Sequence, residues 1–248
     1  VKLVKQGNTI VEFLKDFQIE PVDMEDLEIG ISLPPLLDNE EKIKRTEGMK
    51  ELIDDILERQ DSLKEFEVED DPFHEGYPFL SFTHRSDYLR SYFMYHYGGA
   101  YSDIKPYSFD WSPYFTQLEE SHKDFIGAQE GCEEHIASAD PLIRAAYSEL
   151  TTAAMIIFKP KSIFGKLWKD ATKVKMDSIL EELRLHDGSY HPRAVSNGAM
   201  CDLSVEGRGY PLTWSELLGS IFHPLQYHNP GRWLFGIPHQ GGPEEMYR

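Results

Sequence analysis

Apolar positions recur along the chain with helical and strand-like spacing in alternation. Over residues 38–66 they recur at helical spacing among many charged residues, which predicts one or two amphipathic helices. A second helix is predicted over residues 86–97, with Ser86 as its N-cap. Short apolar runs at 124–128 and 153–159 predict buried strands. Together these elements predict an α/β domain.

Glycine and proline mark the ends of the predicted elements. Gly98 and Gly99 end the helix, and the strand predicted over residues 101–104 stops before Pro106. Asp103 should therefore lie at or near the carboxyl end of a strand, where the ligands of α/β proteins gather.

Further helix starts follow towards the carboxyl terminus. Asp140 and Ser162 are typical first residues of helices, and residues 213–216 match a capping box that opens a short helix towards Phe222. The prolines and glycines after it predict an irregular, loop-rich tail. They are Pro224, Pro230, Pro238, Gly241 and Gly242.

Charge and cysteine content restrict the class of protein. The formal net charge of -18 repels nucleic acid and anionic membranes, so we expect no nucleic-acid partner. Two cysteines without a CxxC pair suit a reducing compartment. The sequence has no apolar run of the length of a membrane span and no signal-peptide pattern, so we expect a soluble, cytoplasmic protein. The opening Val1 in place of Met leaves room for a removed signal or anchor.

The candidate chemistry lies around the glycine pair. Asp87 and Arg90 are three residues apart and share one helix face. Gly98 and Gly99 permit a sharp reversal that would bring Asp103 back towards that face. A carboxylate can accept hydrogen bonds from ribose or sugar hydroxyls, and a guanidinium can bind hydroxyls or diphosphate oxygens. The three side chains therefore suit a nucleotide sugar.

This pattern resembles the DXD-motif glycosyltransferases, a sugar-binding region family that includes capsular polysaccharide synthesis proteins, yeast outer-chain mannosyltransferases and the large clostridial glucosylating toxins. The family pattern runs Ser-Asp, two residues, Arg, an aliphatic helix, Gly-Gly, then Tyr or Trp and Asp-x-Asp. The resemblance is strong over residues 82–108. The matching residues are Ser86, Asp87, Arg90, Gly98, Gly99, Tyr101 and Asp103.

The resemblance implies a GT-A type (Rossmann-like) fold, with a mixed sheet, flanking helices and a loop-rich C-terminal tail. We expect one domain over residues 1–248, in which 1–75 form a divergent N-terminal part with the amphipathic helices. Residues 76–248 would form the core that binds donor and acceptor.

The resemblance also implies roles for single residues. Asp87 and Arg90 match groups that contact the sugar and ribose of the donor, and Asp103 matches an aspartate that contacts the donor and a metal-bound diphosphate. Gly98 and Gly99 belong to the same donor-binding set. Tyr101 joins it as a ring that could stack on a base or sugar.

One residue departs from the family pattern. The second aspartate of the motif, normally the direct metal ligand, is replaced by Lys105. The expected dependence on Mn²⁺ or Mg²⁺ is therefore in doubt, because the ammonium group could itself neutralise the leaving diphosphate. The rival hypothesis keeps a metal held by Asp103 and distant groups, with His239 as a candidate ligand. The catalytic candidates are Asp103, Lys105 and Arg90.

Other reactive residues have plainer interpretations. His223, His228 and His239 fit no compact zinc pattern, and packing is the favoured interpretation. Cys132 and His135 lie among acidic residues and are interpreted as solvated rather than as a nucleophile and its base. The acidic patch that precedes and surrounds them could supply a general base or acceptor contacts, or be a solvated loop. It comprises Glu130, Glu133 and Glu134.

The sequence thus predicts an enzyme, a hexosyl- or pentosyltransferase that moves sugar from a UDP- or GDP-sugar to a hydroxyl of a glycan or polysaccharide. Stereochemistry stays open, because inversion needs a carboxylate base whereas front-face retention does not. The unranked candidates for that base are Glu130, Glu133, Asp187 and Asp202. Two alternatives are a nucleotide-sugar-binding module without turnover, suggested by Lys105, and a metal-dependent nucleotide-sugar hydrolase.

Overall fold

The computed structural model describes residues 2–4, 63, 66–103, 109–189 and 209–238. The chain divides into two compact units, one formed by Val1–Asp16 with His74–Arg248 and the other by Phe17–Phe73. The amphipathic helices predicted over 38–66 lie almost entirely outside the described residues. All helices and strands named below belong to the first unit, and the single domain over 1–248 stays a prediction.

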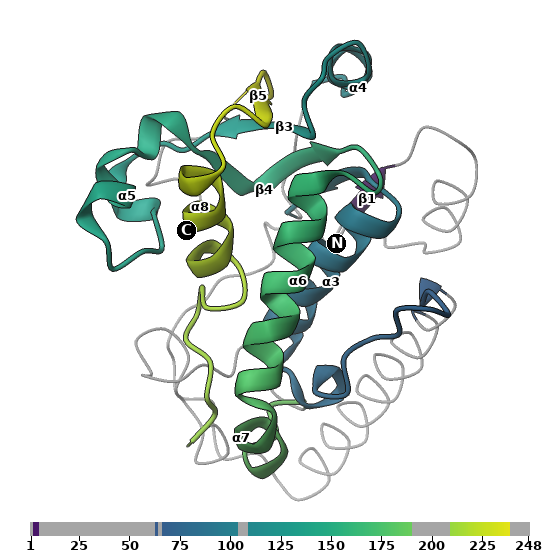
Figure 1. Ribbon diagram of the computed structural model, residues 1–248, viewed down its shortest axis with the longest axis vertical. Helices are drawn as coiled ribbons and strands as arrows, with labels where there is room; N and C mark the ends of the chain where they lie inside the picture. Colours follow the sequence, from purple (N-terminus) through teal and green to yellow (C-terminus); the bar gives the residue numbers. More distant parts are fainter. Residues whose placement is uncertain (1, 5–62, 64–65, 104–108, 190–208, 239–248) are drawn as a thin grey trace, which may run out of the picture. The chain divides into compact units, whose positions relative to one another are not determined.

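The first unit alternates helices and strands (Figure 1). In chain order the elements are β1 (Lys2–Val4), the 3-10 helix η3 (Tyr77–Phe79), α3 (Phe82–His96), β2 (Gly99–Ser102), α4 (Ser112–Glu119), β3 (Phe125–Gln129), η4 (Glu133–His135), α5 (Pro141–Ala145), η5 (Tyr147–Glu149), β4 (Thr151–Phe158), α6 (Ile163–Ser178), α7 (Leu180–Leu185), α8 (Gly219–His228) and β5 (Trp233–Phe235). None of the helices among the described residues combines the length and the apolar composition that a membrane span requires.

The strands form one mixed sheet in the order β1-β2-β4-β3-β5. β1 pairs with β2, and β4 pairs with both β2 and β3, all antiparallel, whereas β3 and β5 run parallel. Because β2 and β3 both run against β4, their carboxyl ends meet at the same edge of the sheet. The mixed sheet with flanking helices confirms the predicted α/β class and is consistent with a GT-A type fold.

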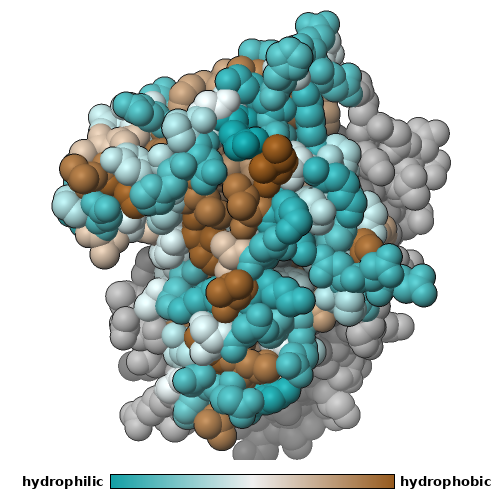
Figure 2. All heavy atoms as spheres, viewed as in Figure 1, coloured by the Kyte–Doolittle hydropathy of each residue, from teal (hydrophilic) through white to brown (hydrophobic). Residues whose placement is uncertain are grey.

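Apolar cores lie on both faces of the sheet. On one face Phe125 and Phe158 stack with ring centroids 4.5 Å apart, and Trp168 of α6 and Phe222 of α8 close over them. Figure 1 shows α3, α6 and α8 side by side, and Figure 2 shows apolar side chains gathered over α8 and beside α6. On the other face Leu118 of α4 packs against a second cluster that includes strand residues. The sheet is therefore buried on both sides, as flanking helices require.

α3 begins five residues earlier than predicted, because its start is fixed by a distant residue. The N-cap is Ser81 rather than Ser86, and the Ser81 backbone N–H donates to the Tyr210 hydroxyl at 3.1 Å. His84 in the first turn also contacts that hydroxyl, at 3.0 Å. A partner more than a hundred residues away leaves no local signal in the sequence.

The reversal between α3 and β2 depends on glycine. Gly98 and Gly99 have φ angles of 63° and 87°, a left-handed region that glycine enters without strain. The Gly98 N–H donates to the Phe93 carbonyl at 3.0 Å, which closes the end of the helix. A Cβ at Gly98 would lie 2.6 Å from the Pro160 backbone nitrogen. The predicted turn is present, and β2 starts directly within it.

The starts of α5 and α6 are as predicted, with Asp140 and Ser162 as N-caps. The irregular tail begins later than predicted. α8 continues through Pro224, and β5 then pairs with β3. Burial of Phe222 and of neighbouring polar side chains outweighs the proline in this helix. Gly241 and Gly242 lie outside the described residues.

Candidate functional site

Two acidic side chains meet one guanidinium where α3 and β2 fold back on each other. Arg90 Nη2 lies 3.6 Å from Asp87 Oδ1 and 3.7 Å from Asp103 Oδ1. Asp87 is three residues before Arg90 on α3, and Asp103 follows β2 at its carboxyl end. The structure therefore brings together the three groups that the sequence predicted to converge. Their roles towards a ligand stay predictions.

Arg90 is fixed by the sheet as well as by its own helix. Its Nη1 donates to the Ala153 carbonyl of β4 at 2.8 Å, and its Nη2 donates to the Tyr101 hydroxyl at 2.5 Å. The Asp103 N–H donates to the Ala154 carbonyl at 3.0 Å, so β4 also sets the position of the aspartate. Contacts to two adjacent elements hold the guanidinium in one orientation.

The three groups differ in exposure, which separates their possible roles. The Asp87 and Arg90 side chains are 6% and 5% exposed, whereas Asp103 is 35% exposed. Asp103 is therefore the carboxylate that a ligand can reach first. Burial raises the pKa of Asp87 to about 7, with Asp103 also raising it and Arg90 opposing the shift. Asp87 thus titrates near neutral pH.

Tyr101 bridges the cluster and is not an exposed stacking surface. Its side chain is 3% exposed, and the Arg90 guanidinium carbon lies 3.7 Å from the ring centroid. The hydroxyl accepts from Arg90 and donates to Asp103 Oδ1 at 3.1 Å. Burial raises the pKa of Tyr101 to about 12, so its proton stays available for that bond. The stacking role predicted for Tyr101 is corrected to that of a bridge, and its place in the donor-binding set stays a prediction.

The remaining predicted site residues are placed only in part. Gly98 packs against the Pro160 backbone, which accounts for glycine there without a ligand. Contacts of Gly98 and Gly99 with a donor stay predictions. Lys105 and His239 lie outside the described residues, so their roles also stay predictions.

The described residues do not fit a metal site. Among them there is no group of three or more His, Cys, Asp or Glu side chains placed to hold a cation. Asp103, the predicted ligand, is instead engaged by Tyr101 and Arg90. The family generally binds a divalent metal together with a nucleotide sugar, so a metal here would need ligands beyond the described part of the chain.

In a second polar cluster the structure disfavours one of the two interpretations left open by the sequence. Glu130 is 7% exposed and contacts His223 rather than forming part of a solvated loop. Loss of hydration and a bond to Glu134 raise the pKa of the Cys132 thiol, which disfavours a reactive thiolate, as interpreted from the sequence. Sequence reasoning could not pair Glu130 with His223, because 93 residues separate them.

Comparison with known proteins supports the predicted resemblance. Residues 12–105 match the family described as "Glycosyltransferase sugar-binding region containing DXD motif". The match includes Asp87, Arg90 and Asp103 and extends further towards the N-terminus than the predicted motif. No curated protein and no solved structure matches the chain. The fold is thus α/β, and less than half of the chain is similar to a glycosyltransferase sugar-binding region.

Proposed function

We propose that this protein is a glycosyltransferase that moves a hexosyl or pentosyl group from a UDP- or GDP-sugar to a hydroxyl of a glycan or polysaccharide. The observation that carries the proposal is the buried Arg90 guanidinium, which lies within 4.0 Å of the carboxylates of Asp87 on α3 and Asp103 at the end of β2. These groups lie inside the segment that matches the sugar-binding family.

The proposed division of labour follows from exposure. Asp103, the most exposed member, accepts hydrogen bonds from sugar or ribose hydroxyls of the donor. Arg90 and Tyr101 hold that carboxylate in one orientation, so little side-chain entropy is lost when the donor binds. The buried Asp87 carboxylate lies on the same guanidinium and helps to balance its positive charge. Binding at a fixed carboxylate places the anomeric carbon for attack.

In the proposed transfer, the oxygen of the acceptor hydroxyl forms a bond to the anomeric carbon while the bond from that carbon to the diphosphate oxygen breaks. The hydroxyl proton passes to a carboxylate base in an inverting reaction or to the leaving diphosphate in a retaining one. The nucleoside diphosphate leaves with the electron pair, so negative charge develops on it. Because the chain carries a net charge of -18, this charge needs a local cation. We assign that role to Lys105, with a divalent metal bound through Asp103 as the rival, which would supply the same electrostatic stabilisation.

The proposal is tested by a thermal-shift screen of UDP- and GDP-sugars, followed by assays of nucleotide release. A ligand that binds only the folded state raises the melting temperature, and the size of the rise reports affinity. We expect at least one donor to stabilise the protein and to release nucleotide faster when a sugar acceptor is added.

The other possible results of these assays would indicate a different function. Stabilisation without nucleotide release would indicate a binding module, and release at the same rate without acceptor would indicate a hydrolase. Absence of stabilisation by every nucleotide sugar would overturn the proposed function.

A further inference from the structure

A buried carboxylate at the end of β3 is locked by a histidine from α8. Glu130 follows β3 directly, and its Oε1 lies 3.0 Å from His223 Nε2. His223 Nδ1 accepts the Ala137 backbone N–H at 3.2 Å, so in this geometry it carries no proton. The ring proton is therefore on Nε2, which donates a hydrogen bond to Glu130 Oε1. One carboxylate oxygen is thereby fixed, which leaves the other to face a different group.

The other oxygen of Glu130 faces a more accessible imidazole. His135, the last residue of η4, places its Nδ1 3.7 Å from Glu130 Oε2, and its side chain is 23% exposed. Its Nε2 has no partner among the described residues. This separation is longer than a hydrogen bond, but the negative charge of the carboxylate still favours the neutral tautomer with the proton on Nδ1, which leaves the Nε2 lone pair able to accept a hydrogen bond. The pair thus offers an acceptor nitrogen near the surface.

α8 holds this arrangement firmly against the sheet. One turn after His223, Gln226 accepts from the Thr151 N–H at 2.8 Å and donates to the Thr151 carbonyl at 2.9 Å. The register between β3 and β4 shifts between Gly127 and Gln129. Such irregularities turn the side chains that follow them, and they often lie next to functional sites. Here the shift immediately precedes Glu130.

The cluster lies at the same edge of the sheet as Asp103. The Asp103 N–H bonds to the Ala154 carbonyl, and the Glu130 N–H bonds to the Leu150 carbonyl on the opposite side of β4. Four residues along a strand and two strand spacings separate the two backbones by about 16 Å. That separation prevents both carboxylates from binding one donor hydroxyl, but it allows a second sugar to lie along the edge beside the donor.

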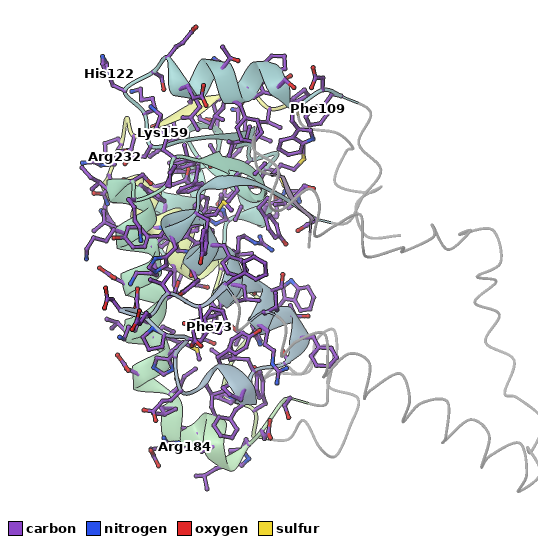
Figure 3. The ribbon with its side chains drawn as sticks, turned by 90° about the vertical axis from the view of Figure 1, so that its right-hand side faces the viewer. Phe73, Phe109, His122, Lys159, Arg184 and Arg232 are labelled. Carbon is purple, nitrogen blue, oxygen red and sulfur yellow. The ribbon has the colours of Figure 1, made fainter. Side chains whose placement is uncertain are left out.

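The opposite edge is occupied by structural contacts. Figure 3 shows His122, Lys159 and Arg232 close together at one end of the molecule. Arg232 contacts Asp124 at 3.2 Å, and Lys159 donates to the Ser121 carbonyl at 2.6 Å. The side chains of Arg232 and Lys159 stabilise the start of β3, so we do not consider them a ligand site.

We infer that His135, oriented by Glu130 and His223, forms a subsite that binds a hydroxyl of the carbohydrate acceptor. The inference rests on the proposed function, because it assigns the acceptor side of the same reaction. His135 Nε2 accepts the hydrogen bond from the sugar hydroxyl, while Glu130 and His223 are positioning residues that do not touch the sugar.

The probe is a panel of p-nitrophenyl glycosides, namely glucoside, galactoside, mannoside and N-acetylglucosaminide, titrated into the intact chain by calorimetry. We expect at least one glycoside to bind, and His135→Ala to raise its Kd about tenfold, as loss of one hydrogen bond in a partly enclosed site requires. His122→Ala, which changes an exposed histidine at the opposite edge, should leave the Kd unchanged.

Kinetics separate a positioning role from a structural one. With the donor identified by thermal shift, Glu130→Gln should raise KM for the glycoside and leave KM for the donor unchanged. Unchanged melting temperatures and unchanged donor-induced shifts in His135→Ala would show that its fold is intact. His135→Gln, which retains a hydrogen-bonding side chain, should recover part of the affinity.

Two results overturn the inference: no glycoside binds the unaltered protein, or the same Kd is measured for the unaltered protein and His135→Ala. The calorimetric titration needs no nucleotide sugar, so its result does not depend on whether the protein binds a nucleotide-sugar donor. If no nucleotide sugar binds but His135→Ala loses glycoside affinity, the subsite stands and the transferase proposal fails.

Discussion

At the scale of single residues, the site combines a buried acid with an exposed one around the same guanidinium. Asp87 is enclosed and Asp103 is partly open, although both lie within 4.0 Å of Arg90. The spacing of Asp87 and Arg90 and the glycine pair were enough to predict that the groups meet. The bridge through Tyr101 and the bond to Ala153 could not be predicted, because both depend on the packing of side chains across β2 and β4.

Asp87→Asn tests the burial of the acid through the pH dependence of stability. The pKa of Asp87 rises from 3.8 to about 7 on folding, so between these values the folded state holds more protons than the unfolded state. Stability of the unaltered protein should therefore fall, relative to the variant, as pH rises from 4 to 7. Melting temperatures of both proteins at pH 5, 6, 7 and 8 measure this difference.

Asp110→Asn is the matched control. Hydrogen bonds from Ser112 lower the pKa of exposed Asp110 from 3.8, so its titration window lies below pH 4. Its difference from the unaltered protein should stay constant between pH 5 and 8. A pH-independent difference for Asp87→Asn as well would contradict the account of the buried acid.

Tyr101→Phe tests the bridge. The ring can still pack under Arg90, but the hydroxyl that links Arg90 to Asp103 is lost. We expect donor affinity to fall about tenfold, because Asp103 loses one of the contacts that orient it. The donor found by thermal shift, titrated calorimetrically into both proteins, gives the ratio. An unchanged Kd would mean that the bridge has no part in binding.

At the scale of elements, local signals predicted the start of a helix where a residue next to it in the sequence caps it, but not where a distant residue fixes it. The starts of α5 and α6 were found from Asp140 and Ser162, whose side chains cap their own helices. The start of α3 was missed because Tyr210 fixes it from far along the chain. Pro224 suggested that the chain becomes irregular, yet burial of α8 against the sheet retains it within a helix.

Gly98→Ala tests the reversal that joins α3 to β2. The substitution meets both a φ of 63° and a Cβ only 2.6 Å from the Pro160 nitrogen. We expect unfolding in urea to lose at least about 2 kcal/mol, since strain and a backbone clash combine. Gly231→Ala is the control, because its φ of 81° gives the strain while nothing lies within 4 Å of the added Cβ. Equal losses in the two variants would show that the Pro160 contact does not constrain the turn.

At the scale of the whole molecule, a strongly acidic chain is proposed to bind an anionic ligand. With a net charge of -18, the overall field opposes a nucleoside diphosphate, so affinity must come from the local arrangement of charges at one edge of the sheet. The topology achieves this by placing the carboxyl ends of β2 and β3 at the same edge. A site at the carboxyl ends of the strands could be expected from an α/β pattern, whereas the order of the strands in the sheet could not.

Chelation tests which cation neutralises the leaving diphosphate. If Lys105 replaces the metal, transfer should keep most of its rate in EDTA, and Lys105→Ala should lower kcat by about a hundredfold, as removal of one stabilising group typically does. Initial rates with EDTA and with added Mn²⁺ measure this. Complete loss of transfer on chelation, restored by Mn²⁺, would contradict the lysine hypothesis and favour the metal.

The affinity of Asp103→Asn for the nucleotide sugar that stabilises the unaltered protein tests most directly whether the donor binds at Asp103. The substitution keeps the size of the side chain and removes its charge. We expect the Kd to rise at least about tenfold and the melting temperature of the ligand-free protein to stay nearly unchanged. Equal affinities in the two proteins would place the donor elsewhere in the molecule.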